Sequence, residues 1–397
     1  MATIITDKAG LQNMSLNLAE DYVLGNDIDA SGAAFTPVGT FGAEFTGTLD
    51  LAGYTISGLN MIVVGDECGL FGCTDGATIS NGTLDGFAIT GEIYVGALAG
   101  IMLNTVVSDI IVTNATIVGE SWVGGVVGYA DNSCTFDDCS VDGTVNSDSS
   151  GGAGLGGFVG LVEGTYTRCS ANVTVTAATE SEIGGFGGYC MDAVFDQSYA
   201  LGDVVGDDFV GGFLGRIFGN NVVATADDCY ARGNVTGNTN IGGFCSDESV
   251  WGTGAVTFTN CYHAGALAGL FVGGFIYSDS GRTTYVACFW DTEVSGESTS
   301  VGGTGKTTAQ MNLIATFQAW DIALSSIDVN DGYPYLGWQE EESDTWLIYG
   351  LSPRTTAPVE DKITLETIRN VEMVAMGRFR VDKEGNAVYR SRYARNV

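Results

Sequence analysis

Three short segments decide the fold: "LGGFVG" at residues 155–160, "IGGFGG" at residues 183–188 and "VGGFLG" at residues 210–215. Each has an aliphatic residue, two glycines and a phenylalanine in the same order, and related segments recur on both sides. The first glycine returns every 27 to 32 residues, a period typical of repeat proteins built from stacked units. These first glycines are Gly69, Gly96, Gly124, Gly156, Gly184, Gly211, Gly242 and Gly273.

Two other positions of the repeat are also regular. The second residue after the first glycine is always apolar, and in most of the later copies it is phenylalanine. A second motif, of the type "YTRCSANVTV", carries cysteine at one position in nearly every copy. Because equal positions of stacked repeats lie above one another, we predict a buried ladder of these side chains. Its members are Phe158, Phe186, Phe213, Phe244, Phe275, Cys139, Cys169, Cys229, Cys261 and Cys288.

The repeat predicts an all-β fold. Each unit holds two or three short alternating apolar stretches separated by Gly, Asn and Asp, and a strand-rich unit of this size must stack on its neighbours. We therefore expect a single-stranded β-solenoid (β-helix) of about eight coils with N- and C-terminal caps. A propeller is the competing architecture, but its blades usually need about 40 residues or more. The paired glycines are expected to permit a tight corner or a close approach of backbones.

The chain resembles the GLUG-motif proteins over about residues 1–338. The resemblance lies in the glycine repeats, in the opening "NLAEDYVLGNDIDASG" and in the closing "CFWDTEVSGESTSVGGTGKTTAQM". It implies the solenoid architecture and a place among large bacterial and archaeal surface proteins, adhesins and phage-associated proteins. It carries no shared catalytic residues.

Charge and composition suggest a division of the chain. Residues 1–360 hold 7 basic and 43 acidic residues, whereas residues 361–397 hold 8 basic and 5 acidic ones. We predict an entry cap (1–60), the solenoid (61–300), a C-terminal cap (301–338), a linker (339–360) and a basic anchoring segment (361–397). That last segment contains "RFRV" and "AVYRSRY", which predict a small β-hairpin. The anchoring candidates are Arg378, Arg380, Arg390, Arg392 and Arg395.

One segment imitates a phosphate-binding loop. "VGGTGKTT" (301–308) has glycines, a lysine and threonines before a stretch that could be helical. However, Ser300 stands where the first glycine of the motif belongs, and the preceding "DTEVSGESTS" is too polar for a buried strand. We expect a structural cap here and no bound cofactor.

The cysteines and acidic residues allow several interpretations. The absence of Cys-x-x-Cys and the single histidine, His263, argue against usual zinc sites, so we expect buried free thiols, with disulfides or metal as alternatives. The acidic pairs Asp137-Asp138, Asp207-Asp208 and Asp227-Asp228 are expected at solvated corners, although two carboxylates could also cleave glycosides. Clustered Asp and Asn leave weak Ca²⁺ binding open.

The net charge of −33 argues against nucleic acid as a partner, and no apolar run is long enough to enter a membrane. Because residues 1–13 lack a secretion-type pattern, we expect synthesis and folding in a cytoplasm. Together these features favour a non-enzymatic virion component, namely a tail fibre, spike or head decoration.

We expect several copies in an assembly, docked to other virion proteins through the C-terminal segment. The outer solenoid would contact host-surface glycan or protein. The alternatives are a prokaryotic cell-surface adhesin module and a polysaccharide-cleaving tailspike. The acidity fits a high-salt setting, or simply a solenoid kept from stacking by repulsion.

Overall fold

The computed structural model describes residues 2–62, 65–147, 152–317, 320, 322–323, 329–342, 378–381 and 387–390. The chain divides into two compact units, Met1–Glu341 and Glu342–Val397. The first unit holds all the glycine repeats.

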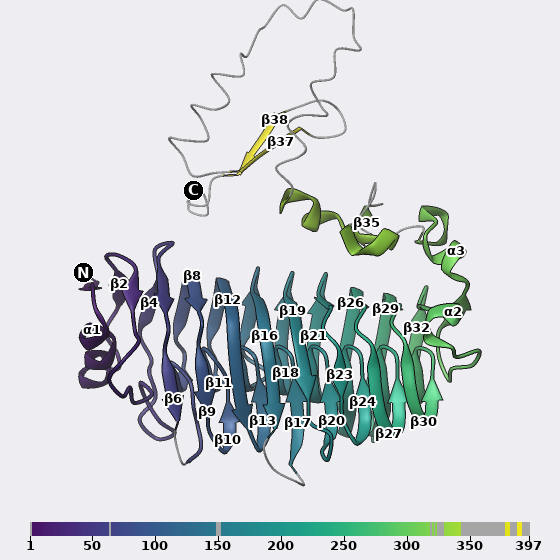
Figure 1. Ribbon diagram of the computed structural model, residues 1–397, viewed down its shortest axis with the longest axis horizontal. Helices are drawn as coiled ribbons and strands as arrows, with labels where there is room; N and C mark the ends of the chain where they lie inside the picture. The colour runs from purple at the N-terminus through teal and green to yellow at the C-terminus, as the bar shows by residue number, and fades with distance from the viewer. Residues whose placement is uncertain are drawn as a thin grey trace, which may run out of the picture. The chain divides into compact units, whose positions relative to one another are not determined.

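The first unit is a parallel β-solenoid of about nine turns, with a repeat of about 29 residues (Figure 1). Its rungs join into a 34-stranded sheet in which each strand pairs in parallel with the equivalent strand one turn later. The predicted all-β solenoid is therefore confirmed, with about one turn more than expected. The entry segment supplies the difference, because Tyr22–Leu24 and Thr48–Asp50 pair in series with the first glycine-bearing rung.

Strands stack into five ladders, A to E, in the order in which each turn visits them. Ladder A follows the glycine pair, and ladder E precedes the glycine pair of the next turn. Some long strands run through two or three ladders, and each is assigned to the ladder in which it begins. Ladder A holds β7 (Phe71–Asp75), β11 (Ala99–Leu103), β14 (Val127–Ala130), β18 (Val159–Thr167), β21 (Gly187–Asp196), β25 (Leu214–Asn220), β28 (Cys245–Trp251) and β31 (Ile276–Ser278). Ladder B holds β1 (Thr3–Ile5), β2 (Tyr22–Leu24), β4 (Thr48–Asp50), β8 (Thr78–Asp85), β12 (Val106–Gly119), β15 (Thr135–Asp137), β26 (Val223–Ala231), β29 (Ala255–His263) and β32 (Thr283–Val286).

The other three ladders complete each turn. Ladder C holds β3 (Ile28–Asp29), β5 (Thr55–Ser57), β16 (Ser140–Ser147), β19 (Ser170–Thr176), β22 (Tyr199–Ala200), β33 (Phe289–Asp291) and β34 (Thr304–Lys306). Ladder D holds β6 (Asn60–Ile62), β9 (Ala88–Thr90) and β23 (Val204–Val205). Ladder E holds β10 (Ile93–Val95), β13 (Ser121–Gly124), β17 (Ala153–Gly156), β20 (Ser181–Gly184), β24 (Asp208–Gly211), β27 (Val235–Gly242) and β30 (Leu267–Gly273).

The glycine pairs allow neighbouring turns to approach at the corner between ladders E and A. A Cβ atom on Gly185 would lie 2.2 Å from the carbonyl oxygen of Gly212, and one on Gly157 would lie 2.1 Å from that of Gly185. Neither glycine has a left-handed φ. Of the two explanations predicted for these glycines, the close approach of backbones is therefore the one that the structure supports.

A second corner, between ladders B and C, is made by left-handed residues that are mostly not glycine. One such residue stands directly before each member of the cysteine column, and its φ lies between 50° and 62° in every case. Asn and Asp tolerate this conformation better than other residues do, and they fill about half of the positions. The column is Ala52, Asn81, Asp109, Asp138, Arg168, Gln197, Asp228, Asn260 and Ala287.

Both ends of the solenoid carry caps. At the N-terminal end, α1 (Lys8–Asn13) and η1 (Met14–Leu16) bury Leu11 and Met14, and the side chain of Asp7 caps α1. The C-terminal cap contains α2 (Thr292–Ser295), α3 (Thr308–Met311), η2 (Ile314–Phe317), η3 (Val329–Gly332) and η4 (Gly337–Glu342), with an antiparallel pair of β35 (Ile322–Ala323) and β36 (Tyr335–Leu336).

The last part of this cap turns back along the outside of ladder C. There Tyr199, Tyr230 and Tyr262 stack on successive turns with ring centroids 5.0 Å apart. Trp338 packs on Tyr199, and Phe317 and Trp320 pack on Tyr262. The tyrosine ladder thus provides the docking surface for the end of this unit.

In the second unit, the structure describes β37 (Arg378–Val381) and β38 (Ala387–Arg390), which pair antiparallel. The small C-terminal β-hairpin expected from the sequence is therefore present. Its predicted turn lies outside the described residues.

Candidate functional site

The outer surface of ladder A, with the adjoining corner of ladder E, gathers aromatic side chains that the core does not use. Tyr129, Tyr189 and Arg216 lie in one outward column, because β14, β18, β21 and β25 pair in register through Leu161. We call the whole surface the aromatic face. Its members are Tyr94, Trp122, Tyr129, Tyr189, Phe209, Phe218 and Trp251.

Four rings of the aromatic face form a line of contacts that crosses ladder A obliquely. Trp122 meets Tyr189 edge-on with centroids 5.6 Å apart, Tyr189 lies 6.1 Å from Phe218, and Phe218 meets Trp251 edge-on at 4.9 Å. Gly154 makes room for this line of rings, because a Cβ atom there would lie 2.2 Å from the Trp122 ring. Trp251, at the end of the line, is 46% exposed.

Arg216 fixes the centre of the aromatic face. Its guanidinium lies 4.1 Å from the ring centroid of Phe209 and 4.2 Å from that of Phe218. Its Nε donates to Asp247 Oδ2 at 2.9 Å, and its Nη1 lies 3.4 Å from Glu182 Oε1. A cation held by two rings and two carboxylates has little freedom, so both rings are pre-oriented.

Carboxylates border the same surface. Burial raises the pKa of Glu163, and the neighbouring charge of Asp192 raises it further. Burial also raises the pKa of Glu182, and this effect exceeds the opposing attraction of Arg216. Burial raises the pKa of Tyr129 to about 12, so its hydroxyl stays protonated at neutral pH. The face therefore combines apolar rings with hydrogen-bonding groups at its rim.

A different surface covers the outside of ladder B. Threonine and aspartate side chains from β18, β21, β26 and β29 line a shallow depression of about 530 Å³. Registered pairing places Thr225 beside Thr257 and Asp196 beside Asp227 on neighbouring turns. The lining of this groove is mainly threonine and aspartate with Val194, Phe195 and Ala226, and it carries no outward aromatic ring.

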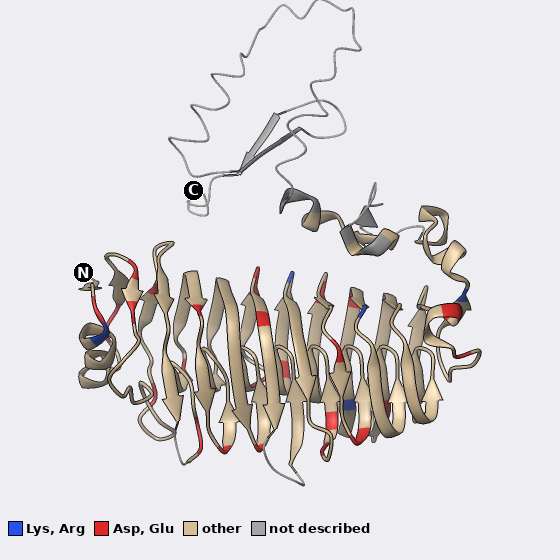
Figure 2. Ribbon diagram, viewed as in Figure 1, with Lys and Arg blue, Asp and Glu red and all other residues tan. Residues whose placement is uncertain are grey.

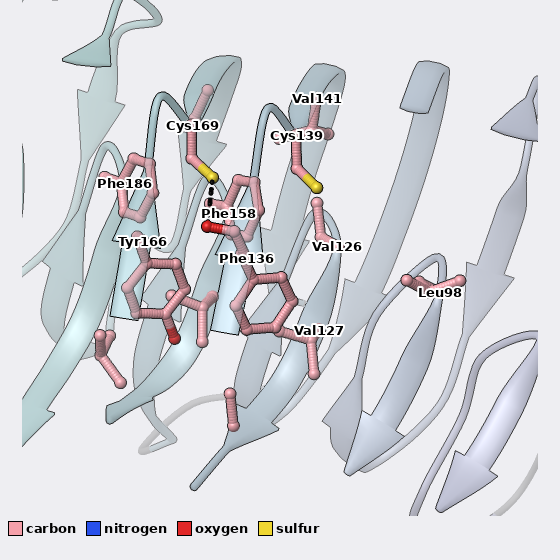
Figure 3. Packing of buried hydrophobic residues seen from close by; sticks show 14 of the residues in the cluster. Leu98, Val126, Val127, Phe136, Cys139, Val141, Phe158, Tyr166, Cys169 and Phe186 are labelled. Carbon is pink, nitrogen blue, oxygen red and sulfur yellow. Dashed lines mark hydrogen bonds between the residues drawn. The ribbon is translucent and has the colours of Figure 1, made fainter. Parts of the chain in front are cut away.

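The predicted ladder residues all lie inside the coils, each at most 2% exposed. The phenylalanines stack with centroids 4.8 to 5.0 Å apart, the spacing of neighbouring strands. Figure 3 shows Phe158 and Phe186 beside a second aromatic column that contains Phe136 and Tyr166. Their role is packing rather than binding.

All ten cysteines are buried and free. The Cys169 thiol donates to the Phe136 carbonyl at 3.5 Å (Figure 3), and burial raises the pKa of Cys169 well above its usual range. Within the described part of the chain, no three His, Cys, Asp or Glu side chains gather closely enough to hold a metal ion. Weak Ca²⁺ binding remains a prediction.

The phosphate-loop-like segment forms part of the C-terminal cap. Gly302 packs against the ring of Tyr285, where a Cβ atom would lie 2.2 Å from Cζ. Thr304–Lys306 continues the ladder as β34, and Lys306 Nζ lies 5.1 Å from the ring centroid of Phe289. Thr307 caps the four-residue α3 together with Gln310. The glycines and threonines thus have structural partners in the cap.

Two of the acidic pairs, Asp137-Asp138 and Asp227-Asp228, lie on different turns of the B–C corner, and Asp208 of the third pair begins β24. Asp137 and Asp138 both bind Arg168 of the next turn, with Arg168 Nε 2.5 Å from Asp138 Oδ1. Asp208 accepts from Asn240 Nδ2 at 2.7 Å and from Thr239 Oγ1 at 2.9 Å. Asp228 is one of the left-handed residues of the B–C corner. Figure 2 shows acidic residues along most of the solenoid and very few basic ones.

The predicted anchoring arginines fall in the second unit. Arg378, Arg380 and Arg390 belong to the strands of the hairpin, whereas Arg392 and Arg395 lie outside the described residues. Their anchoring role stays a prediction. In the described residues, every helix is too short or too polar to cross a membrane.

Comparisons with known proteins agree with the repeat. The family model of the GLUG motif matches residues 119–146, which run from the end of β12 to β16. Halomucin of Haloquadratum walsbyi is 31% identical over 219 residues, a match that covers 51% of this chain and 2% of halomucin. The chain thus matches only a very small part of that relative. The protein is a β-solenoid that carries a GLUG motif at residues 119–146.

Solved structures that align with the chain include two whose names refer to IgA1 proteases. An IgA1 protease aligns with a TM-score of 0.51 and 15% identity, covering 93% of this chain and 27% of that one. A candidate immunoglobulin A1 protease from Bacteroides ovatus aligns with a TM-score of 0.47 and 16% identity, covering 85% of this chain and 92% of that one. The prediction of a non-enzymatic protein is therefore wrong. The IgA1 protease with the TM-score of 0.51 shares the solenoid fold and is named as an enzyme, so the architecture does not exclude enzymatic activity. The likeness itself extends to the fold alone.

The aromatic face was not predicted from the sequence. Its outward column reads Ile101, Tyr129, Leu161, Tyr189, Arg216 and Asp247, so the residue type changes from each turn to the next. Counting outward positions from each glycine pair would have placed these residues on one surface. The tyrosine ladder on ladder C was visible as an aromatic residue directly after the cysteine column.

Proposed function

We propose that the solenoid is a cell-surface adhesion module that binds its ligand on the aromatic face. The carrying observation is the line of rings from Trp122 to Trp251, held in place by Arg216 on the outside of a regular scaffold. An extended cluster of partly exposed aromatic rings usually marks an interaction surface. Trp, Tyr and Arg are also the residues that carry most binding energy at such surfaces.

The scaffold suits recognition because it is already ordered. Each strand of ladder A in the middle of the solenoid pairs with a strand on either side, so the rings project from a continuous parallel sheet. A ligand would therefore bind without first ordering the protein, which lowers the entropic cost of binding.

The halomucin match supports the cell surface as the location, since the name places that relative among the mucins. The net charge of −33 supports a setting in which salt screens repulsion, and the relative comes from the genus Haloquadratum. Neither observation speaks for a virion. A tail fibre, spike or head decoration, docked through residues 361–397 to other virion proteins in several copies, is a narrower proposal that the basic terminal segment supports.

The location can be tested on cells that produce the protein. Antibody labelling and protease shaving of intact cells should reach the solenoid, and label found only after lysis would contradict the proposal. Purified virus particles serve as the comparison: solenoid in those particles, lost on deletion of residues 342–397, would favour the virion role instead.

Adhesion can be tested with surface variants. Replacing Phe218 and Trp251 together by Ala should lower attachment of producing cells to their substratum by about tenfold, because truncating central aromatic anchors removes most binding energy. Phe41→Ala is the matched control, since Phe41 is an exposed ring (68%) outside the aromatic face. Equal attachment of both variants would overturn the role of the face.

A further inference from the structure

We infer that the ligand of the aromatic face is an uncharged polysaccharide that lies along the line of rings from Trp122 to Trp251. This inference rests on the proposed function and names the class of its ligand. Four observations support it: the spacing of the rings, the hydrogen-bonding groups at their rim, the charge of the surface and the paired state of the strands beneath.

The rings come from successive turns of the solenoid, each two positions further along its strand than the one before. Tyr189, Phe218 and Trp251 come from successive strands β21, β25 and β28, and neighbouring strands lie about 4.8 Å apart. An extended sugar chain presents flat C–H faces at a comparable interval. Ring centroids 6.1 and 4.9 Å apart therefore offer consecutive sugars one aromatic contact each.

The rim supplies partners for hydroxyl groups. Glu163 and Glu182 border the rings, and carboxylates accept hydrogen bonds from sugar hydroxyls. Arg216 holds Phe209 and Phe218 from within the face, so these rings need no reorientation when a sugar stacks on them. The combination of apolar rings and polar rim is the usual composition of a site for a small polar ligand.

Charge restricts the ligand further. The chain carries 48 acidic and 15 basic residues, and Arg216 is already engaged by Asp247 and Glu182. A polymer of uronate, sulfate or phosphate groups would be repelled by this surface. An uncharged polysaccharide avoids that cost.

The strands beneath the rings argue against an extended peptide. Peptides that join a sheet bind to an open strand edge through backbone hydrogen bonds. Here β21 pairs with β18 and β25, and β25 pairs with β21 and β28, so neither offers an open edge. Recognition on this face depends on side chains alone.

The groove on ladder B is the weaker candidate for the same ligand. Its outward residues are threonine, aspartate and Val194, and its aromatic residue Phe195 is buried in the core. Hydrogen bonds alone would have to outcompete water there.

The test uses the full chain in 0.1 M salt, where a screening length of about 10 Å leaves the repulsion between the acidic surface and an anionic polymer in effect. Hydroxyethyl cellulose, galactomannan, mannan and dextran serve as uncharged probes, and carboxymethyl cellulose is the anionic counterpart of the first. Binding is followed by affinity electrophoresis and by tryptophan fluorescence. We expect at least one uncharged probe to bind and carboxymethyl cellulose to bind more weakly than hydroxyethyl cellulose.

The variants assign the site. The Phe218→Ala and Trp251→Ala changes should each weaken binding by about tenfold, as expected for an aromatic anchor, while Phe41→Ala and a Thr225→Val change in the ladder B groove should leave it unchanged. Binding of none of the uncharged probes, preference for the anionic probe, or loss in Thr225→Val alone would each overturn the inference. If adhesion still depends on Trp251 while no polysaccharide binds, the proposed adhesion stands and its ligand is a protein.

Discussion

The inside and the outside of the coils follow opposite rules. Inside, the same residue type returns on turn after turn, as in the phenylalanine stack from Phe158 to Phe275. Outside, the column that contains Tyr189 and Arg216 changes chemistry at almost every turn. An interior position sees nearly identical neighbours above and below, whereas an exterior position also faces solvent or a ligand. The repeat therefore encodes the scaffold, and departures from the repeat encode what the scaffold presents.

The strongest way to break the interior is to remove one stacked ring. Phe213 contacts Phe186 and Phe244 and is fully buried. Phe213→Ala should lower the free energy of unfolding by about 3–5 kcal/mol, because it removes apolar contact and leaves a cavity. Denaturant unfolding followed by circular dichroism measures this, with the exposed Phe41→Ala as control. A loss below about 1 kcal/mol in Phe213→Ala would contradict the stacked interior.

A buried histidine gives the interior a pH dependence. Burial lowers the pKa of His263 to about 4, and the charge of Arg232 lowers it as well. Between pH 6.5 and 4 the unfolded chain takes up a proton at His263 that the folded chain does not. The free energy of unfolding should therefore decrease by up to about 3 kcal/mol as the pH is lowered through this range. The acidic residues add their own pH dependence, which a His263→Gln variant shares. Identical slopes for the two proteins in this window would show that His263 is not buried uncharged.

The glycine corner can be filled by a single methyl group. Gly185→Ala would place Cβ 2.2 Å from the Gly212 carbonyl oxygen. We expect a loss of about 1–3 kcal/mol from overpacking. In Gly32→Ala the new Cβ meets nothing within 4 Å but the backbone is left-handed, so it measures the conformational penalty alone. Thermal unfolding of the two variants separates crowding from backbone strain; a smaller loss in Gly185→Ala would argue against crowding.

The exterior should respond most to salt. Raising the salt from 0.1 to 1 M shortens the screening length from about 10 to 3 Å and weakens repulsion among the surplus acids. We expect the free energy of unfolding to rise by about 1 kcal/mol or more, because the repulsion among the acidic residues is weakened. The loss caused by Phe213→Ala should be the same at both salt concentrations. Unchanged stability of the parent protein would show that its charges are already paired or well separated.

The regular parts of the fold were predictable and the irregular parts were not. The apolar columns through Phe158 and Cys169 predicted the solenoid, because packing in register demands a fixed period. The entry segment contributes strands without the glycine signature, so the number of turns was underestimated. The left-handed B–C corner was not predicted, because Asn, Asp, Arg, Gln and Ala all occupy it. No single residue type in the sequence marks this backbone conformation.

The candidate site was hidden for a related reason. Trp122, Tyr189 and Trp251 stand at unrelated distances along the chain and occupy different positions of the repeat. Only the register between turns brings them together. The Arg216 cluster depends on the same register, which pairs Arg216 with Asp247.

The direction of the ladder hydrogen bonds gives the solenoid a mechanical property. In a parallel β-solenoid these bonds run along the axis, so tension between the two ends is carried by one rung after another in series. A rung of about 29 residues that detaches would lengthen the chain by roughly 90–100 Å at full extension, while the rungs that remain keep their packing. Under tension such a molecule would lengthen in steps of about equal size. Each released turn could pair again with its neighbour when the force falls.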